Sequence, residues 1–404
     1  MKRRVPRWGE VRPLIGGQPL RWNRTAALLE RCASVEDVRA LARRRVPRAV
    51  FDYTDGAAGQ DESSLHRARR AFARVEFQPR VLQDISTVDT STMILGKPAA
   101  LPLIFGPTGF TRMMHYAGEP AVAAVAERMG IPYGLSTLGT ISIEDLAAVA
   151  PNLRHWFQLY LMTDRGYARD LIQRARDCGY DTIILTVDTP VPGRRHRDVR
   201  NGLTIPPRLT ARTLADMATH PRWWMNLLTT EPLSFATLTS TEGTVADLIS
   251  RVFDPAITVE DLDWLRAEWS GALVVKGIQT VDDAELVVRH GADGVILSTH
   301  GGRQLERAPV PFEILPRVRE VLDERVDVLI DGGVMSGADV VAAVAQGATA
   351  VAIGRAYLYG LMAAGEAGVQ RVGDLLREEI VTTMQLLGRT SIPSLGPECV
   401  RLRD

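Results

Sequence analysis

Short apolar runs alternate with amphipathic stretches over most of the chain. Two segments show the plan clearly: helical spacing over Asp282–His290 leads to a glycine and the run 291–298, and Gly337–Gln346 leads to 347–354. A third copy follows Arg165–Cys178, at 179–188. A helix, a glycine cap and a short apolar run are typical of a helix that returns to a buried parallel strand.

Eight such runs lie between helical patterns, and polar residues gather at their ends. The count favours an α/β fold of the TIM type, a (β/α)8 barrel, over an open sheet, which usually has fewer strands. In such a barrel the carboxyl ends of the strands carry the active site. The expected strands are 101–106, 131–136, 156–161, 182–188, 273–276, 294–300, 328–332 and 350–354.

The regions outside the strands predict the domain organisation. Residues 1–30 are expected to form a loosely ordered basic tail, and 31–404 a single barrel domain that begins with short helices at Ser34–Arg45 and Pro47–Tyr53. A long insertion after strand 4, residues 197–256, is of a length that is usually functional or mobile. Its Trp223-Trp224 cluster fits a lid, an oligomer contact, a membrane-surface foot or simple local packing.

Composition narrows the class of protein. The chain has 404 residues, 48 basic and 48 acidic side chains and 46% hydrophobic content, so it can bury a large core and has no net field for nucleic acid. The three cysteines, Cys32, Cys178 and Cys399, form no metal-binding pattern and indicate a reducing, cytoplasmic compartment without structural zinc. Neither a secretory signal nor a membrane span is recognisable, so a soluble or peripheral protein is expected.

The segment 298–304, Ser-Thr-His-Gly-Gly-Arg-Gln, carries the clearest candidate chemistry. His300 offers a base, and Asp188, from another strand end, could orient and stabilise its protonated ring. Arg303 and Arg195 could clamp one carboxylate. Taken alone, His300 could equally be a structural histidine.

Two glycine-bearing strand ends predict a phosphate site. Asp331-Gly332-Gly333 and Gly354-Arg355 follow strands seven and eight, where many barrels bind a cofactor phosphate, although turn-forming glycines are the simpler interpretation of each alone. Lys276 ends a buried strand, so its ammonium needs an anion or an electron-rich ring nearby unless it reaches solvent.

In combination these motifs resemble the FMN-dependent α-hydroxy acid oxidases and dehydrogenases, most closely the bacterial L-lactate dehydrogenase branch. The resemblance covers most of the chain from about Ser34. It depends on segments that occur in family order: 157–160 (FQLY), 186–190 (TVDTP), 275–277 (VKG), 300–304 (HGGRQ), 331–333 (DGG) and 354–355 (GR).

The resemblance implies an FMN enzyme that oxidises an L-2-hydroxy acid, lactate-like or bulkier, to the 2-oxo acid. His300 would remove the substrate proton and Asp188 would stabilise the histidine. Arg195 and Arg303 would bind the carboxylate, Tyr53 and Tyr160 would bond the substrate, and Lys276 would stabilise the reduced flavin. The remaining cofactor contacts would come from Thr108, Gly109, Ser136, Gln158, Thr186, Ser298, Asp331, Gly332, Gly333, Gly354 and Arg355.

Four positions depart from the family pattern. Thr299 stands where Asn usually precedes the histidine, and Met335 where many members have an arginine, which leaves one phosphate cation absent. Leu138 and Met162 are aliphatic where members acting on small acids often have an aromatic residue, which predicts a wider pocket.

The resemblance also implies partners. A quinone, a cytochrome or oxygen would reoxidise the flavin, with a quinone favoured; a homotetramer is expected, and the 197–256 insertion could touch the inner face of the cell membrane. Two alternatives stay open: the same flavin barrel acting on a specialised metabolite or modified peptide, and a flavin-binding protein with little catalysis.

Overall fold

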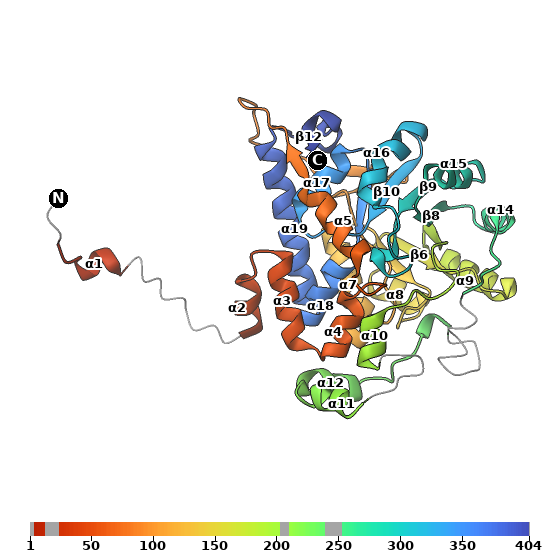
Figure 1. Ribbon diagram of the computed structural model, residues 1–404, viewed down its shortest axis with the longest axis horizontal. Coiled ribbons are helices and arrows are strands. Elements are labelled where there is room, and N and C mark those ends of the chain that lie inside the picture. The colour runs from red at the N-terminus through yellow and green to blue at the C-terminus, as the bar shows by residue number, and fades with distance from the viewer. Residues whose placement is uncertain (1–3, 13–23, 203–209, 239–252, 404) are drawn as a thin grey trace.

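Eight parallel strands close into a barrel in the computed structural model (Figure 1), which describes residues 4–12, 24–202, 210–238 and 253–403. Neighbouring strands pair in the order β10-β11-β4-β5-β6-β7-β8-β9, so the last strand returns to the first and no edge is left open. The predicted (β/α)8 fold is confirmed. The strands are β4 (Leu103–Phe105), β5 (Tyr133–Ser136), β6 (His155–Leu159), β7 (Thr182–Thr186), β8 (Ala272–Ile278), β9 (Gly294–Leu297), β10 (Asp327–Asp331) and β11 (Ala350–Ile353).

Helices cover the outside of the barrel, and their boundaries follow local sequence signals. The helix after β6 ends at the Cys178–Gly179 turn, and the helices after β8 and β10 begin at Thr280 and Ser336, whose hydroxyls each accept a backbone N–H of the first turn. The outer helices are α7 (Gly118–Met129), α8 (Ile143–Val149), α9 (Arg165–Asp177), α14 (Val259–Glu268), α15 (Val281–Arg289), α16 (Pro311–Val321), α17 (Gly337–Ala345) and α18 (Arg355–Ala364).

The amino-terminal mouth of the barrel is closed by a hairpin, β2 (Thr92–Ile94) and β3 (Lys97–Ala99). Ile94 is fully buried among the side chains that fill the barrel interior, and the Leu95 N–H donates to Asp327 at the start of β10. Chemistry is therefore confined to the opposite, carboxyl end of the strands.

Helices and strands from the beginning and the end of the barrel domain pack on the same flank, whereas α1 (Trp8–Val11) stands away from the body. The α3 (Val35–Arg45) and α4 (Arg48–Asp55) helices and the long α19 (Glu366–Leu386) lie beside α18 (Figure 1), while β1 (Val75–Phe77) pairs with β12 (Val400–Leu402). In addition α2 (Arg24–Glu30) contacts α19 and buries Leu29, so part of the packed body lies within residues 1–30, which the sequence assigned to the tail. Short elements complete the chain: α1 (Trp8–Val11), α5 (Ser63–Ala73), α6 (Thr111–Met114), and 3-10 turns at Ile392–Ser394 and Pro397–Cys399.

The described part of the insertion is helical rather than an open loop. It contains α10 (His196–Asn201), α11 (Ala211–Ala218), α12 (Pro221–Leu228) and a 3-10 turn, Ala236–Leu238; residues 203–209 and 239–252 lie outside the described residues. Phe235 is buried, 4.3 Å from Phe110 ring to ring, and the Trp223 indole donates to the Met113 carbonyl at 2.9 Å. Trp223 thus packs against α6 of the barrel body and not only within the insertion, whereas the neighbouring Trp224 is 37% exposed.

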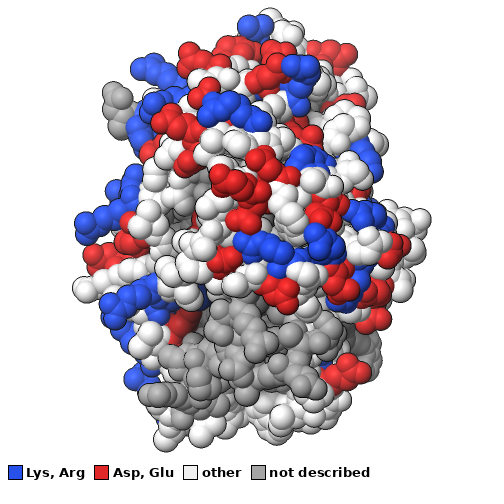
Figure 2. All heavy atoms as spheres, turned by 90° about the vertical axis from the view of Figure 1, so that its right-hand side faces the viewer, with Lys and Arg blue, Asp and Glu red and all other residues white. Residues whose placement is uncertain are grey.

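The surface is mixed in charge. Figure 2 shows basic and acidic side chains interspersed over the upper and middle parts of one face, with no extended area of one sign among the described residues there. Over the part of the chain that is described, no helix is long and apolar enough to cross a bilayer.

Candidate active site

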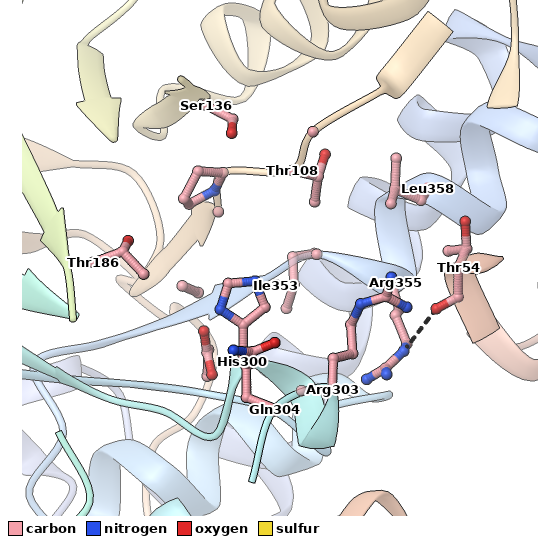
Figure 3. Close-up of a pocket in the computed structure, with 18 of the residues that line it drawn as sticks. Thr54, Thr108, Ser136, Thr186, His300, Arg303, Gln304, Ile353, Arg355 and Leu358 are labelled. Atoms are coloured by element: carbon pink, nitrogen blue, oxygen red, sulfur yellow. Dashed lines mark hydrogen bonds between the residues drawn. The ribbon is translucent and has the colours of Figure 1, made fainter. Parts of the chain in front are cut away.

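One cavity opens at the carboxyl ends of the barrel strands and gathers most of the predicted site residues. Figure 3 shows His300 with Thr186 on one side and Arg303 and Arg355 on the other, while Ser136 and Thr108 lie across the cavity. Among the predicted residues, those that line it are Tyr53, Thr108, Gly109, Ser136, Gln158, Tyr160, Thr186, Arg195, Lys276, His300, Arg303, Asp331, Gly332, Gly333, Gly354 and Arg355.

His300 and Asp188 form the pair that the sequence could only suggest. The His300 Nδ1 lies 3.1 Å from Asp188 Oδ1, and the Asp188 side chain is only 1% exposed. Burial alone would raise the pKa of Asp188, but the charges of His300 and Lys276 outweigh it and lower that pKa. The carboxylate therefore stays ionised and holds Nδ1, which leaves Nε2 of the ring for a substrate.

The loop that carries His300 has a strained backbone and is held in place by hydrogen bonds. His300 has φ +55°, a left-handed conformation that is costly for a residue with a side chain. Its N–H donates to Ser298 Oγ at 2.9 Å, while Thr299 Oγ1 accepts the Gly302 N–H. Gln304 donates from Nε2 to the Asp188 and Val191 carbonyls and so ties this loop to the one after β7. Thr299, which departs from the family pattern, thus stabilises the turn and does not line the cavity.

Lys276 is paired within the protein. Its Nζ lies 3.0 Å from Asp331 Oδ2 and donates to Ser298 Oγ at 2.9 Å, so the anion that the buried strand end required is a carboxylate of the chain itself. Burial would lower the pKa of Lys276, but Asp331 and Asp188 raise it, and the ammonium remains charged. Ser298, expected to contact the cofactor, is buried, and its Oγ accepts from Lys276 Nζ and from the His300 N–H.

Arg303 is held by backbone carbonyls rather than by carboxylates. Its Nη1 donates to the carbonyls of Tyr53 and Gly56 at the carboxyl end of α4, where the last carbonyls of a helix have no partner of their own. Burial, and secondarily the neighbouring Arg195, lower the pKa of Arg303 to about 10. No ion pair with Arg303 occurs within the described residues, so its charge is free for an anion.

Arg195 and Arg303 flank the same aromatic ring. Their guanidinium carbons lie 5.7 and 4.9 Å from the centre of the Tyr53 ring, close enough for cation–π attraction. Arg195 also has an acidic neighbour, Asp198, at 3.5 Å. The two predicted carboxylate-binding arginines are therefore brought together, with Arg303 the more available of the pair.

A hydrogen-bonded row crosses three neighbouring strands on the other wall. Gln158 Oε1 accepts from Ser136 Oγ at 3.1 Å, and Gln158 Nε2 donates to Thr186 Oγ1 at 3.0 Å. Thr108 Oγ1, at the next strand end, lies 2.7 Å from the Tyr357 hydroxyl. These groups present amide and hydroxyl edges to the cavity, which suits a flat heteroaromatic ring.

The glycine loops leave space for an anion. Gly332 has φ +89°, and a side chain there would meet nothing nearer than 3.9 Å, so its backbone is open. Arg355 donates to the Thr54 and Gly56 carbonyls at 2.9 and 2.8 Å. Burial lowers the pKa of Arg355, and no carboxylate among the described residues pairs with it. Asp331 Oδ1 is buried and, within the described residues, lacks a hydrogen-bond partner. An open backbone loop, a guanidinium and an unpartnered acceptor fit the phosphate and hydroxyl groups of FMN.

Sequence reasoning missed several residues of the cavity. Arg69 from α5, Phe110, Phe253 and Leu358 also line it, while Met162 does not and Leu138 does. Arg69 is one of three arginines on α5, so only its position in the fold distinguishes it. Phe253 lies near the end of the insertion and meets Tyr160 edge to face at 5.1 Å; no local pattern predicts that contact.

Comparison with known proteins agrees with this geometry. The family model of FMN-dependent dehydrogenases matches residues 42–402. A Mycobacterium tuberculosis protein provisionally named an L-lactate dehydrogenase is 51% identical over 400 residues, 99% of this chain and 96% of its own. The L-lactate dehydrogenase of Caulobacter vibrioides is 40% identical over 371 residues, 90% of this chain and 96% of its own. A crystal structure of (S)-mandelate dehydrogenase, described as a monotopic membrane protein, superposes with a TM-score of 0.87 at 39% identity and covers 92% of this chain and 100% of its own.

Proposed function

The chain belongs to the FMN-dependent dehydrogenase family and oxidises L-2-hydroxy acids to 2-oxo acids with FMN as cofactor, and we propose that His300, Arg303 and Arg195 carry this reaction on acids bulkier than lactate. The observation that carries the assignment is the guanidinium of Arg303, which has no carboxylate partner among the described residues and lies in the same cavity as His300 of the His300–Asp188 pair. A base and a carboxylate-binding cation on one short loop are what a 2-hydroxy acid requires. The two alternatives raised by the sequence receive no support from relatives named as hydroxy acid dehydrogenases.

The side chains divide the work. Arg303 and Arg195 bind the substrate carboxylate, and Tyr53 and Tyr160 contact the rest of the substrate head group. His300 Nε2 takes a proton from the substrate, at its α-carbon or its hydroxyl, and Asp188 stabilises the imidazolium that results. FMN, when bound, would be the oxidant that takes up the two electrons and the second hydrogen. Lys276, kept cationic by Asp331, would stabilise the negative charge of the reduced flavin.

The substrate side chain is assigned from the apolar part of the lining. Leu138, Phe110 and Phe253 contribute aliphatic and aromatic surface to the same cavity as His300. Such a wall stabilises a side chain larger than methyl by burying it. Anaerobic loss of visible flavin absorbance should therefore occur with L-lactate and faster with (S)-mandelate or L-2-hydroxy-4-methylpentanoate, whereas the D-acids should fail. Strict preference for L-lactate would contradict the wide pocket, and His300→Ala should abolish bleaching with every acid.

For the electron acceptor we propose a quinone. The relatives reported above are named dehydrogenases. Reoxidation by a soluble quinone should be much faster than by air, and rapid production of hydrogen peroxide would contradict this choice.

We propose that α11 and α12 contact the surface of a membrane. Leu214, Trp224, Met225 and Leu228 are exposed on these two helices, with Leu228 at 75%, and Figure 1 shows the pair at the lower edge, away from the barrel. Trp223 holds α12 against the barrel, and the exposed apolar side chains beside it suit contact with the interface between a membrane and water. In vesicle flotation, Trp224→Ser with Leu228→Ser should reduce binding, while Leu386→Ser, equally exposed on α19, should not. If the parent, the Trp224→Ser/Leu228→Ser double variant and Leu386→Ser float equally, the membrane contact is refuted.

The same resemblance suggests a homotetramer. Light scattering of the purified holoenzyme should give about four times the chain mass of 44.4 kDa, and a monomer would exclude it.

A further inference from the structure

A second guanidinium-bearing residue, Arg69, lines the same cavity as Arg355, and its charge acts on Arg355. We propose that Arg69 binds the phosphate of FMN together with Arg355 and replaces the cation that is absent at Met335. The inference depends on the phosphate site assigned above to the loops at Gly332–Gly333 and Gly354–Arg355.

The α5 helix is fixed against those loops. An added Cβ at Gly333 would lie 2.6 Å from the Ala68 carbonyl oxygen, and one at Gly302 would lie 2.9 Å from the Leu65 nitrogen. Only glycine permits so close an approach of a loop to a helix. Arg69, next to Ala68, therefore leaves the helix at the wall of the cavity and lines it with Gly333, Met335 and Arg355.

The Arg69 guanidinium lies beside Met335, where it can replace an arginine side chain at position 335. Arg69 Nη2 lies 3.9 Å from Met335 Sδ, although the two residues are 266 positions apart in the chain. A thioether is a weak acceptor and carries no charge, so this contact does not neutralise the arginine. An arginine at 335 would reach the region that Arg69 already occupies.

The charge balance leaves room for an anion. Within the described residues neither Arg69 nor Arg355 forms an ion pair with a carboxylate, and Arg355 is held only by the Thr54 and Gly56 carbonyls. Burial is the main cause of the lowered pKa of Arg355, and the charge of Arg69 contributes in the same direction. Two like charges around one glycine-lined space repel each other until an anion lies between them, and a phosphate can accept from both guanidinium groups.

Comparing FMN with riboflavin, which lacks the phosphate, isolates this contact. Arg69→Gln should weaken FMN binding by about 10- to 100-fold, the usual range for losing one charge-assisted contact, and leave riboflavin binding unchanged. Release of FMN on dilution of the holoenzyme, followed by flavin fluorescence, gives the first measurement. Rebinding of FMN and of riboflavin to the deflavinated protein, with circular dichroism as a check of folding, gives the second.

Two further variants sharpen the test. Arg70→Gln removes an exposed arginine from the next position of the same helix and should bind both flavins as the parent does. Met335→Arg added to Arg69→Gln should recover most of the FMN affinity, because it returns a guanidinium to the same place from the other side.

The outcomes separate this inference from the site on which it depends. Arg69→Gln with parental FMN affinity, or with equal loss of FMN and riboflavin, would overturn the role of Arg69. If Arg355→Gln also fails to discriminate FMN from riboflavin, the phosphate site itself is misplaced. Selective loss of FMN in Arg355→Gln but not in Arg69→Gln refutes only the inference about Arg69.

Discussion

Replacing Asp188 by asparagine tests the centre of the site with little change of shape. The substitution keeps a polar group near His300 Nδ1, 3.1 Å away, but removes the negative charge. Two unit charges about 4 Å apart attract by about 4 kcal/mol at an effective dielectric constant of about 20. The His300 side chain is 28% exposed, so solvent screens part of this attraction and about 2–4 kcal/mol remains. That energy corresponds to a decrease of about 30- to 1,000-fold in the rate of flavin reduction, because the imidazolium forms as the proton is transferred.

Stopped-flow measurement of anaerobic flavin bleaching with an L-2-hydroxy acid gives this rate directly. The chain offers a matched control in a second histidine–aspartate pair, His290 Nδ1 and Asp263 Oδ1 at 2.8 Å on the surface, where Asp263→Asn should leave the rate unchanged. FMN content and the unfolding midpoint should be checked for both variants. A rate for Asp188→Asn within threefold of the parent, with FMN bound, would refute the role of the carboxylate.

Three further predictions follow from the same geometry. Arg303→Lys keeps the charge but loses the planar fork, so the KM for the hydroxy acid should rise by about 10- to 100-fold with a smaller change in kcat; an unchanged KM would exclude Arg303 from carboxylate binding. Because the pKa of Asp188 is lowered in the folded state, its stabilisation is present above about pH 4 and is lost as the pH falls through the folded value. The difference in urea midpoint between the parent and Asp188→Asn should therefore narrow from pH 7 to pH 3, and a constant difference would contradict this sign. An added Cβ at Gly109 would lie 2.9 Å from Leu138 Cβ, so Gly109→Ala should destabilise the protein by about 1–3 kcal/mol in thermal unfolding, and an unchanged midpoint would show that Leu138 moves freely.

The sequence by itself determined the barrel and the face that carries the chemistry. Strand positions follow from short apolar runs, and helix ends follow from residues such as Ser336 and Gly179, which act on their own neighbours. Polar residues at the strand ends, His300 among them, could be assigned to one face because all strands of a barrel point the same way. These signals depend on neighbouring residues in the sequence, so they can be recognised without knowledge of the packing.

Only the tertiary structure shows which side chains from distant parts of the chain contact one another. The carboxylate beside Lys276 comes from Asp331, two strands away, and the hydroxyl of Ser298 faces that pair instead of the cavity. The Arg69 guanidinium reaches Met335 because α5 packs against the glycine loop after β10. A charged residue on an amphipathic helix has the same local pattern whether it faces solvent or a cavity, since its surroundings are set by which element packs against the helix. Sequence therefore located the strand ends, and packing alone decided which charges meet there.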